Sequence, residues 1–458
     1  MIYTSQSVLK ANAMFHAPKF SNRAFFVVFL IVFVTQIVDA IIGTLADILW
    51  EFTISFWGVA LFFSISALYA FGQYFILGVV KTKNKEKEIS RKQFNTLERI
   101  LTIVQYILLA ILVLVNLQII LNAQYSTVLL RIGVVVSYGL AVTIMGLLSY
   151  SLFSWFKVNR SAVVLLYGLA ASMISIYIIS VALIFNIALQ EKPAMFTPQS
   201  EIVFKVLPGT IDEILNSLQT YSSIIFFFLI WGGTILLLRE NVHRIGKVKF
   251  WVLMSSPLIA WTIFFLLFYQ VIDATLPVGY DPVMDLVVPV LLLLSSQIAA
   301  QILIGANFRS VAKAIHVPII KDYMMIAAYG FILFFAATSA TISAAGYPPF
   351  GFVNVLLLGP FSFLILNGLY RSAIYVAEDT KLRQSIKILA KRESTLLDVG
   401  AAAEIQKEIQ NRVMVAVKAS AKSLEEQSGV KPSLTDTELR NHLEMVVQEL
   451  RNARISRK

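Results

Sequence analysis

Long apolar runs separated by short polar connections make up most of the chain. Ten of these runs reach about 20 residues, the length that a helix needs to cross roughly 30 Å of hydrocarbon. A backbone exposed to lipid must satisfy its own hydrogen bonds, so each run is predicted to be a helix. The ten predicted spans are Ala24–Thr44, Phe52–Val80, Ile100–Leu121, Ile132–Phe156, Ala162–Leu189, Leu218–Leu238, Phe250–Ile272, Leu286–Phe308, Tyr323–Ala345 and Phe352–Tyr370.

The distribution of Lys and Arg predicts the orientation of these spans. Up to residue 377, one set of connections and the N-terminal segment hold 20 Lys and Arg residues, whereas the alternate connections hold only Lys192 and Lys205. Basic residues concentrate on the cytoplasmic side of membrane proteins. We therefore expect a cytoplasmic N-terminal segment over 1–22, a transmembrane domain over 23–371 and a cytoplasmic tail over 372–458.

The tail is polar, but apolar residues recur along it at helical spacing. Its first predicted helices carry Leu382, Leu389 and Leu396 every seven residues, and its last predicted helix carries Leu439, Leu443 and Leu450 on one face. Amphipathic helices of this kind need a surface on which to bury their apolar face. That surface is either a protein partner or a second copy of the chain, or else the tail itself, folded as a helical hairpin or against the cytoplasmic loops.

Composition supports the membrane interpretation and excludes several function classes. The chain is 58% hydrophobic and 14% charged, whereas soluble proteins carry about 25% charged residues. It has no cysteine, which excludes disulfides, iron–sulfur clusters and thiolate zinc sites, and its four His lie outside the apolar runs. No phosphate-binding loop or nucleophile motif is present, so no catalytic residue, metal or cofactor is predicted. The net charge of +11 reflects the basic cytoplasmic side, and no nucleic-acid partner is predicted.

Ionisable residues inside a bilayer are costly and often mark functional sites. Asp39 lies in the outer third of the first predicted span, with Gln36 one turn before it, and Arg131 enters the fourth span from the same side. One hypothesis is that Asp39 and Arg131 form an ion pair lining a cavity open to the outside. The alternative is that Arg131 reaches the outer headgroups while water reaches Asp39.

A second polar stripe lies on the eighth predicted span. Gln297 and Gln301 are four residues apart and therefore share one helix face. They either line a path for a substrate or hydrogen-bond to a neighbouring helix.

Three short segments resemble a known group of proteins. These are Tyr347-Pro-Pro-Phe-Gly351, Lys381-Leu-Arg-Gln-Ser-Ile386 and Val430-Lys-Pro-Ser-Leu-Thr-Asp436. Together they are similar to archaeal multi-pass membrane proteins that have a cytoplasmic helical tail and no assigned function. The resemblance covers the last quarter of the chain and implies an archaeal plasma membrane, but it implies no site residues.

The expected fold is therefore an all-α polytopic bundle with a cytoplasmic helical tail. Two function classes remain for such a protein. The first is a non-enzymatic membrane sensor or assembly component that passes signals or contacts through the tail. The second is a secondary transporter for a small solute, with Asp39 and the Gln297/Gln301 stripe as its site.

Overall fold

A computed structural model describes residues 22–45, 49–86, 92–190, 194–196, 211–240, 242–273, 288–315, 318–338 and 346–373. The chain divides into two compact units, one formed by Met1–Thr82 with Glu98–Tyr370 and the other by Lys83–Leu97 with Arg371–Lys458. Almost all the described helices belong to the first unit, which is the subject of the following paragraphs.

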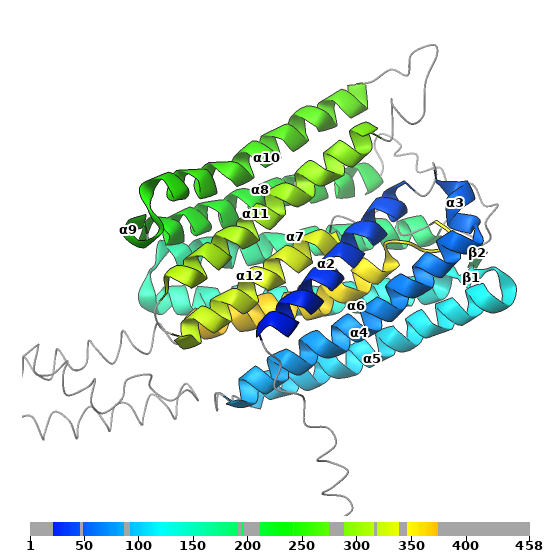
Figure 1. The fold of residues 1–458 in the computed structure, drawn as a ribbon, viewed down its shortest axis with the longest axis horizontal. Helices are drawn as coiled ribbons and strands as arrows, with labels where there is room; N and C mark the ends of the chain where they lie inside the picture. The colour runs from blue at the N-terminus through cyan, green and yellow to red at the C-terminus, as the bar shows by residue number, and fades with distance from the viewer. Residues whose placement is uncertain are drawn as a thin grey trace, which may run out of the picture. The chain divides into compact units, whose positions relative to one another are not determined.

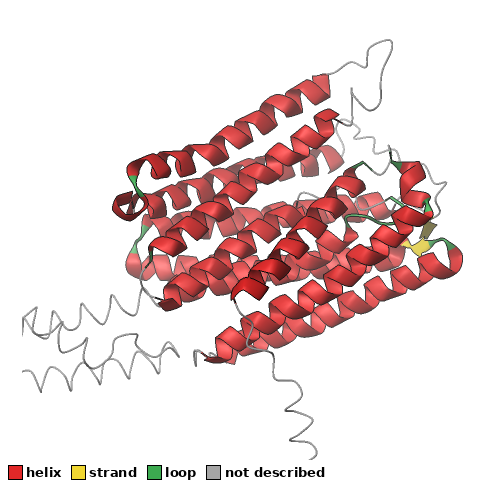
Figure 2. Ribbon diagram, viewed as in Figure 1, coloured by secondary structure: helices red, strands yellow, loops and turns green. Residues whose placement is uncertain are grey.

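The first unit is an all-α bundle with one two-stranded ribbon (Figures 1 and 2). Its helices are α2 (Asn22–Thr44), α3 (Trp50–Ile54), α4 (Phe56–Glu86), α5 (Lys92–Asn122), α6 (Thr127–Asn159), α7 (Ala162–Gln190), α8 (Ile211–Glu240), α9 (Val242–Ile245), α10 (Lys247–Asp273), α11 (Val288–Ala314) and α12 (Pro318–Thr338), followed by the helix Phe352–Ala373. The strands are β1 (Tyr125–Ser126) and β2 (Met195–Phe196), which pair in antiparallel fashion.

All ten predicted spans overlap long helices in this part of the chain. Within the described residues, nine helices are long and apolar enough to cross a membrane, and the protein is therefore an integral membrane protein with a helical bundle. The helix α11 overlaps the remaining predicted span but is not among the nine. The side chains of several α11 residues lie outside the described part of the chain.

The helix Phe352–Ala373, which we call the core helix, is the most deeply buried of the nine. In its most apolar 18-residue stretch, 94% of the residues are buried, compared with 78% in α12 and 6% in α10. Gly351 precedes it with φ of 86°, a left-handed conformation that glycine adopts without strain. Its residues Leu356, Leu358 and Phe361 are fully buried, so the core of the bundle is formed around this helix.

Close backbone contact joins the core helix to α12. A Cβ atom built on Gly368 would lie 2.5 Å from the backbone nitrogen of Ala327, and one built on Gly330 would lie 2.9 Å from that of Ile365. No side chain fits at either position without movement of the helices. Small residues allow such close packing in membranes, where dispersion and hydrogen bonds replace the hydrophobic effect between helices.

Several predicted features lie outside the described residues. The side chains of Gln297 and Gln301 are among them, although α11 carries both residues. The tail residues Leu382, Leu389, Leu396, Leu439, Leu443 and Leu450 are also outside, and their roles stay predictions.

The close contact between α12 and the core helix gives a first prediction. Gly368→Ala should lower the unfolding temperature of the purified protein, because overpacking a filled contact costs about 1–3 kcal/mol. Differential scanning fluorimetry in detergent micelles would measure the change. Gly139→Ala in α6 is the matched control, because a Cβ there would meet nothing within 4 Å. Equal effects of the two variants would contradict the close contact.

Candidate functional site

Asp39 of α2 contacts the beginning of the core helix. Its side chain is fully buried, with 0% of its surface exposed. The Gly351 N–H donates a hydrogen bond to Oδ1 over 2.8 Å, and the Asn354 N–H donates one to Oδ2 over 3.2 Å. The first N–H groups of a helix have no acceptor within that helix, and its N-terminus carries a partial positive charge. Asp39 thus supplies both an acceptor and a complementary charge from a distant part of the sequence.

Asn354 and Gln36 strengthen the same junction. The Asn354 Nδ2 donates to the backbone oxygen of Gln36 over 3.0 Å, and the Gln36 Nε2 donates to the Leu333 oxygen of α12 over 3.3 Å. The remaining side-chain oxygens of the two residues, Asn354 Oδ1 and Gln36 Oε1, are buried without a hydrogen-bond partner. Each amide therefore retains one free acceptor next to the contact between α2 and the core helix.

Other helices bond to the next residues of the core helix. The Ser137 Oγ of α6 donates to the Val355 oxygen over 2.6 Å, and the Gln105 Nε2 of α5 donates to the Leu356 oxygen over 3.4 Å. Tyr69 of α4 donates its hydroxyl proton to Gln105 Oε1 over 3.2 Å. Side chains from four helices thus surround the first turns of the core helix, and we call Gln36, Asp39, Gln105, Ser137 and Asn354 the polar cluster.

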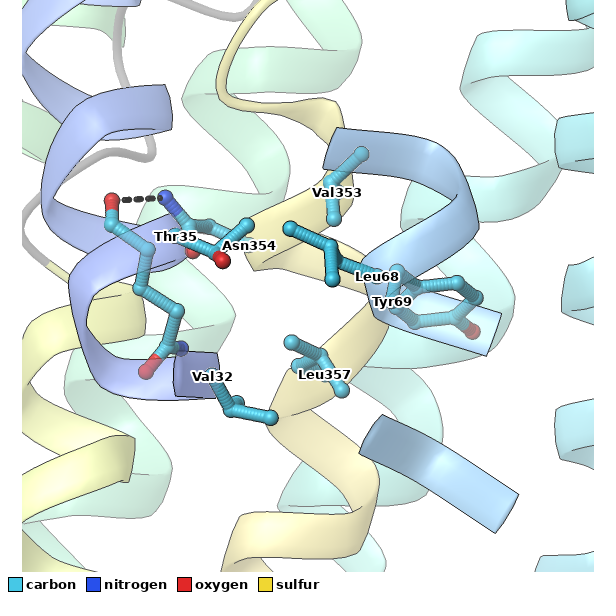
Figure 3. Close-up of a pocket in the computed structure, with 8 residues that line it drawn as sticks. Val32, Thr35, Leu68, Tyr69, Val353, Asn354 and Leu357 are labelled. Atoms are coloured by element: carbon cyan, nitrogen blue, oxygen red, sulfur yellow. Dashed lines mark hydrogen bonds between the residues drawn. The ribbon is translucent and has the colours of Figure 1, made fainter. Parts of the chain in front are cut away.

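A small hollow lies beside the polar cluster, between α2, α4 and the core helix (Figure 3). Thr35, Gln36, Tyr69 and Asn354 belong to its lining, and aliphatic side chains such as Val32 and Leu357 complete it. Its volume of about 10 Å³ is roughly the minimum that one water molecule requires. The surface that faces the hollow is apolar, so the hollow is a small packing gap beside the polar cluster.

The described residues show no ion pair between Asp39 and Arg131. Arg131 of α6 is partly exposed, and its Nε donates to the Asn186 Oδ1 of α7 over 2.9 Å. Asp39 instead accepts the two backbone N–H groups of the core helix. Asp39 and Arg131 thus have separate partners: Arg131 bonds to an amide side chain, and Asp39 bonds to the N-terminus of the core helix.

A cap of residues outside the spans fixes the segment before the core helix. The Tyr125 hydroxyl of β1 donates to the Gly346 oxygen over 3.0 Å, and its ring stacks on that of Tyr347 with centroids 6.2 Å apart. Burial raises the pKa of Tyr125 well above its usual value, and Tyr347 adds to the effect. The Tyr125 hydroxyl therefore remains a donor at physiological pH. We call Tyr125, Tyr347 and β2 the outer cap, after the side of the membrane that the distribution of Lys and Arg predicts for it.

Comparison of the chain with family models, curated proteins and solved structures gives no match. The site therefore rests on its geometry. Sequence analysis selected Asp39 and Gln36, which the structure brings together, but it missed Gln105, Ser137 and Asn354. All three are polar residues inside apolar runs, and this property could have marked them as candidates from the sequence.

The contact of Asp39 with the core helix predicts a stability effect. Asp39→Ala should lower the unfolding temperature, because each buried N–H left without an acceptor costs about 1–3 kcal/mol. Thr35→Ala, one turn earlier on α2, is the matched control, since the Thr35 hydroxyl bonds only to Ile31 of its own helix. Thermal unfolding monitored by circular dichroism would compare them. An Asp39→Ala effect no larger than that of Thr35→Ala would contradict the assigned contact.

The separate partners of Asp39 and Arg131 predict additivity. The decreases in unfolding temperature caused by Asp39→Asn and Arg131→Gln should add in the double variant, as expected for sites without shared partners. Arg131→Gln combined with Asn186→Ala provides the comparison, and here the effects should not add because both changes break one hydrogen bond. Coupling above about 1 kcal/mol between positions 39 and 131 would restore the ion-pair hypothesis.

Proposed function

We propose that this integral membrane protein is a non-enzymatic sensor or assembly component that passes signals or contacts from its membrane domain to its cytoplasmic tail. The observation that carries the proposal is the position of the core helix. It is the most buried of the nine apolar helices, and the chain continues from its end directly into the tail. A shift of this helix would therefore displace the residues that begin the tail.

The contacts at the other end of the core helix support the proposal. Asp39 bonds to its first turn, and the outer cap contacts the segment immediately before it. A ligand, a lipid or a partner that changed the outer cap would act on the core helix through these bonds. The polar cluster thus provides a defined set of interactions that two conformations of the core helix could make or break.

The proposed topology has ten spans, with both termini in the cytoplasm of an archaeal cell and the bundle in its plasma membrane. One set of connections holds 20 Lys and Arg residues and the alternate set holds two, and this asymmetry supports the orientation. The bilayer is then the first partner, and the tail binds a protein or a second copy through Leu382, Leu389, Leu396, Leu439, Leu443 and Leu450. We propose no nucleic-acid partner.

Secondary transport of a small solute is the second candidate. The observation that favours it is the fully buried carboxylate of Asp39 within a membrane-spanning helix. Carboxylates at such depth frequently belong to proton or ion pathways.

The sensor proposal predicts that disrupting the outer end of the core helix changes the tail. Asp39→Ala should alter amide hydrogen exchange of tail peptides from 378–458 by about fivefold, which corresponds to roughly 1 kcal/mol. Hydrogen-exchange mass spectrometry of the full chain in lipid nanodiscs would measure this. Thr35→Ala is the control and should leave tail exchange unchanged. If Asp39→Ala lowers the unfolding temperature but leaves tail exchange as in the wild type, the proposed coupling is wrong.

Deleting 378–458 separates the two candidates. Proteoliposomes containing the full chain or the shortened chain are compared for pH-gradient-driven uptake from a panel of small solutes. Uptake that persists without the tail would support the transporter and overturn the sensor proposal. The sensor proposal expects no uptake from either chain.

A further inference from the structure

The environment of Asp39 opposes its charge and supports it at the same time. Burial of an ionised carboxylate in a membrane protein costs several kcal/mol because the apolar surroundings replace water. The two N–H groups and the positive end of the core-helix dipole favour the ionised form. Such opposed contributions allow a single proton to change the contact.

No charged side chain among the described residues is a partner of Asp39. Its interactions are those with the backbone of Gly351 and Asn354. Titratable side chains on the surrounding elements include Glu51 of α3, Tyr69 of α4, Tyr329 of α12, and Tyr125 and Tyr347 of the outer cap, and none of them bonds to the Asp39 carboxylate. Tyr69 bonds to Gln105 and Tyr125 bonds to Gly346, so neither hydroxyl is directed to the carboxylate.

An acceptor for an additional proton is present at the same junction. Asn354 is 0% exposed, its backbone N–H already donates to Asp39, and its Oδ1 has no hydrogen-bond partner. Gln36, one turn before Asp39 and 1% exposed, likewise has an unpartnered Oε1. Buried acceptors without partners are uncommon and call for an explanation. Gln36 and Asn354 also border the small hollow of about 10 Å³ between α2, α4 and the core helix.

We propose that Asp39 is a proton-binding site, and that binding of a proton loosens the contact between α2 and the core helix. The proton is taken from water and forms an O–H bond on one carboxyl oxygen, whose charge changes from −1 to 0. That oxygen ceases to accept the backbone N–H of Asn354, and the new O–H donates to Asn354 Oδ1. The bond from the Asn354 backbone N–H is thereby exchanged for one to the Asn354 side chain, and the attraction between the carboxylate and the helix dipole is lost.

This regulation rests on the proposed role of the core helix, but proton binding can be measured without reference to the tail. The full chain in lipid nanodiscs is titrated while infrared difference spectroscopy records the C=O stretch of protonated carboxylic acids. A band should appear on acidification, shift in Asp39→Glu and be absent in Asp39→Asn. A wild-type spectrum that lacks an Asp39 band at every pH, or shows it unchanged at every pH, overturns the proposal even if Asp39→Asn does not fold.

Asn354→Ala tests the acceptor. It keeps the backbone N–H but removes Oδ1, so the midpoint of the infrared titration should move to lower pH by about one unit, since the neutral acid loses its hydrogen bond. Ser362→Ala is the matched control, because Ser362 is also buried on the core helix with an unpartnered oxygen and lies two turns away. An unchanged midpoint in Asn354→Ala would exclude Oδ1 as the acceptor.

Hydrogen exchange measures the loosening itself. In the wild type, the protection of a peptide covering 346–360 should fall about fivefold on acidification relative to a peptide from α6 in the same sample. Asp39→Asn should show the low protection at all pH values. Constant protection in the wild type overturns the switch. If the infrared band titrates and the protection of 346–360 falls, but tail exchange does not change, the proton site is retained. That outcome refutes only the proposed sensor function.

Discussion

The first turn of the core helix carries N–H groups that require acceptors, and in this protein that turn is buried inside a membrane bundle where water is scarce. Asp39 meets this requirement from α2, more than 300 positions earlier in the sequence. Because an unsatisfied N–H in apolar surroundings costs several kcal/mol, the depth of the core helix depends on this carboxylate. Gln105 and Ser137 donate to carbonyl oxygens of the next residues of the core helix, and the Gln36 backbone oxygen accepts from the Asn354 side chain.

The proposed signalling role and the proposed proton site use one set of atoms. In both proposals, the carboxylate of Asp39 holds the helix end most strongly while it carries charge and accepts two N–H groups. Asp39 therefore serves as a structural contact between α2 and the core helix, and its charge regulates the strength of that contact. The outer cap adds a second approach to the same helix through Tyr125 and Gly346, and it does not involve a titrating group at physiological pH.

The spans could be predicted because hydropathy and length alone determine whether a helix crosses a bilayer, and each predicted span overlaps a long helix. Which helices and side chains contact one another could not be predicted in this way. Charge complementarity suggested Arg131 as one possible partner of Asp39, but Arg131 bonds to Asn186 of α7, and Asp39 bonds to the backbone of the core helix. Similarly, nothing in the sequence indicated that Gly368 and Gly330 allow backbone contact between α12 and the core helix.

The burial of the core helix also constrains the order of membrane assembly. Among the described helices it comes last in the chain, yet the other helices pack around it. During synthesis, the earlier helices are therefore in the bilayer before the element at their centre has been made. The early bundle must remain loosely associated, or open on one side, until this helix enters, and Asp39 would lack its N–H donors until that moment. Completion of the bundle and the binding of Asp39 to the N-terminus of this helix are consequently the same late event.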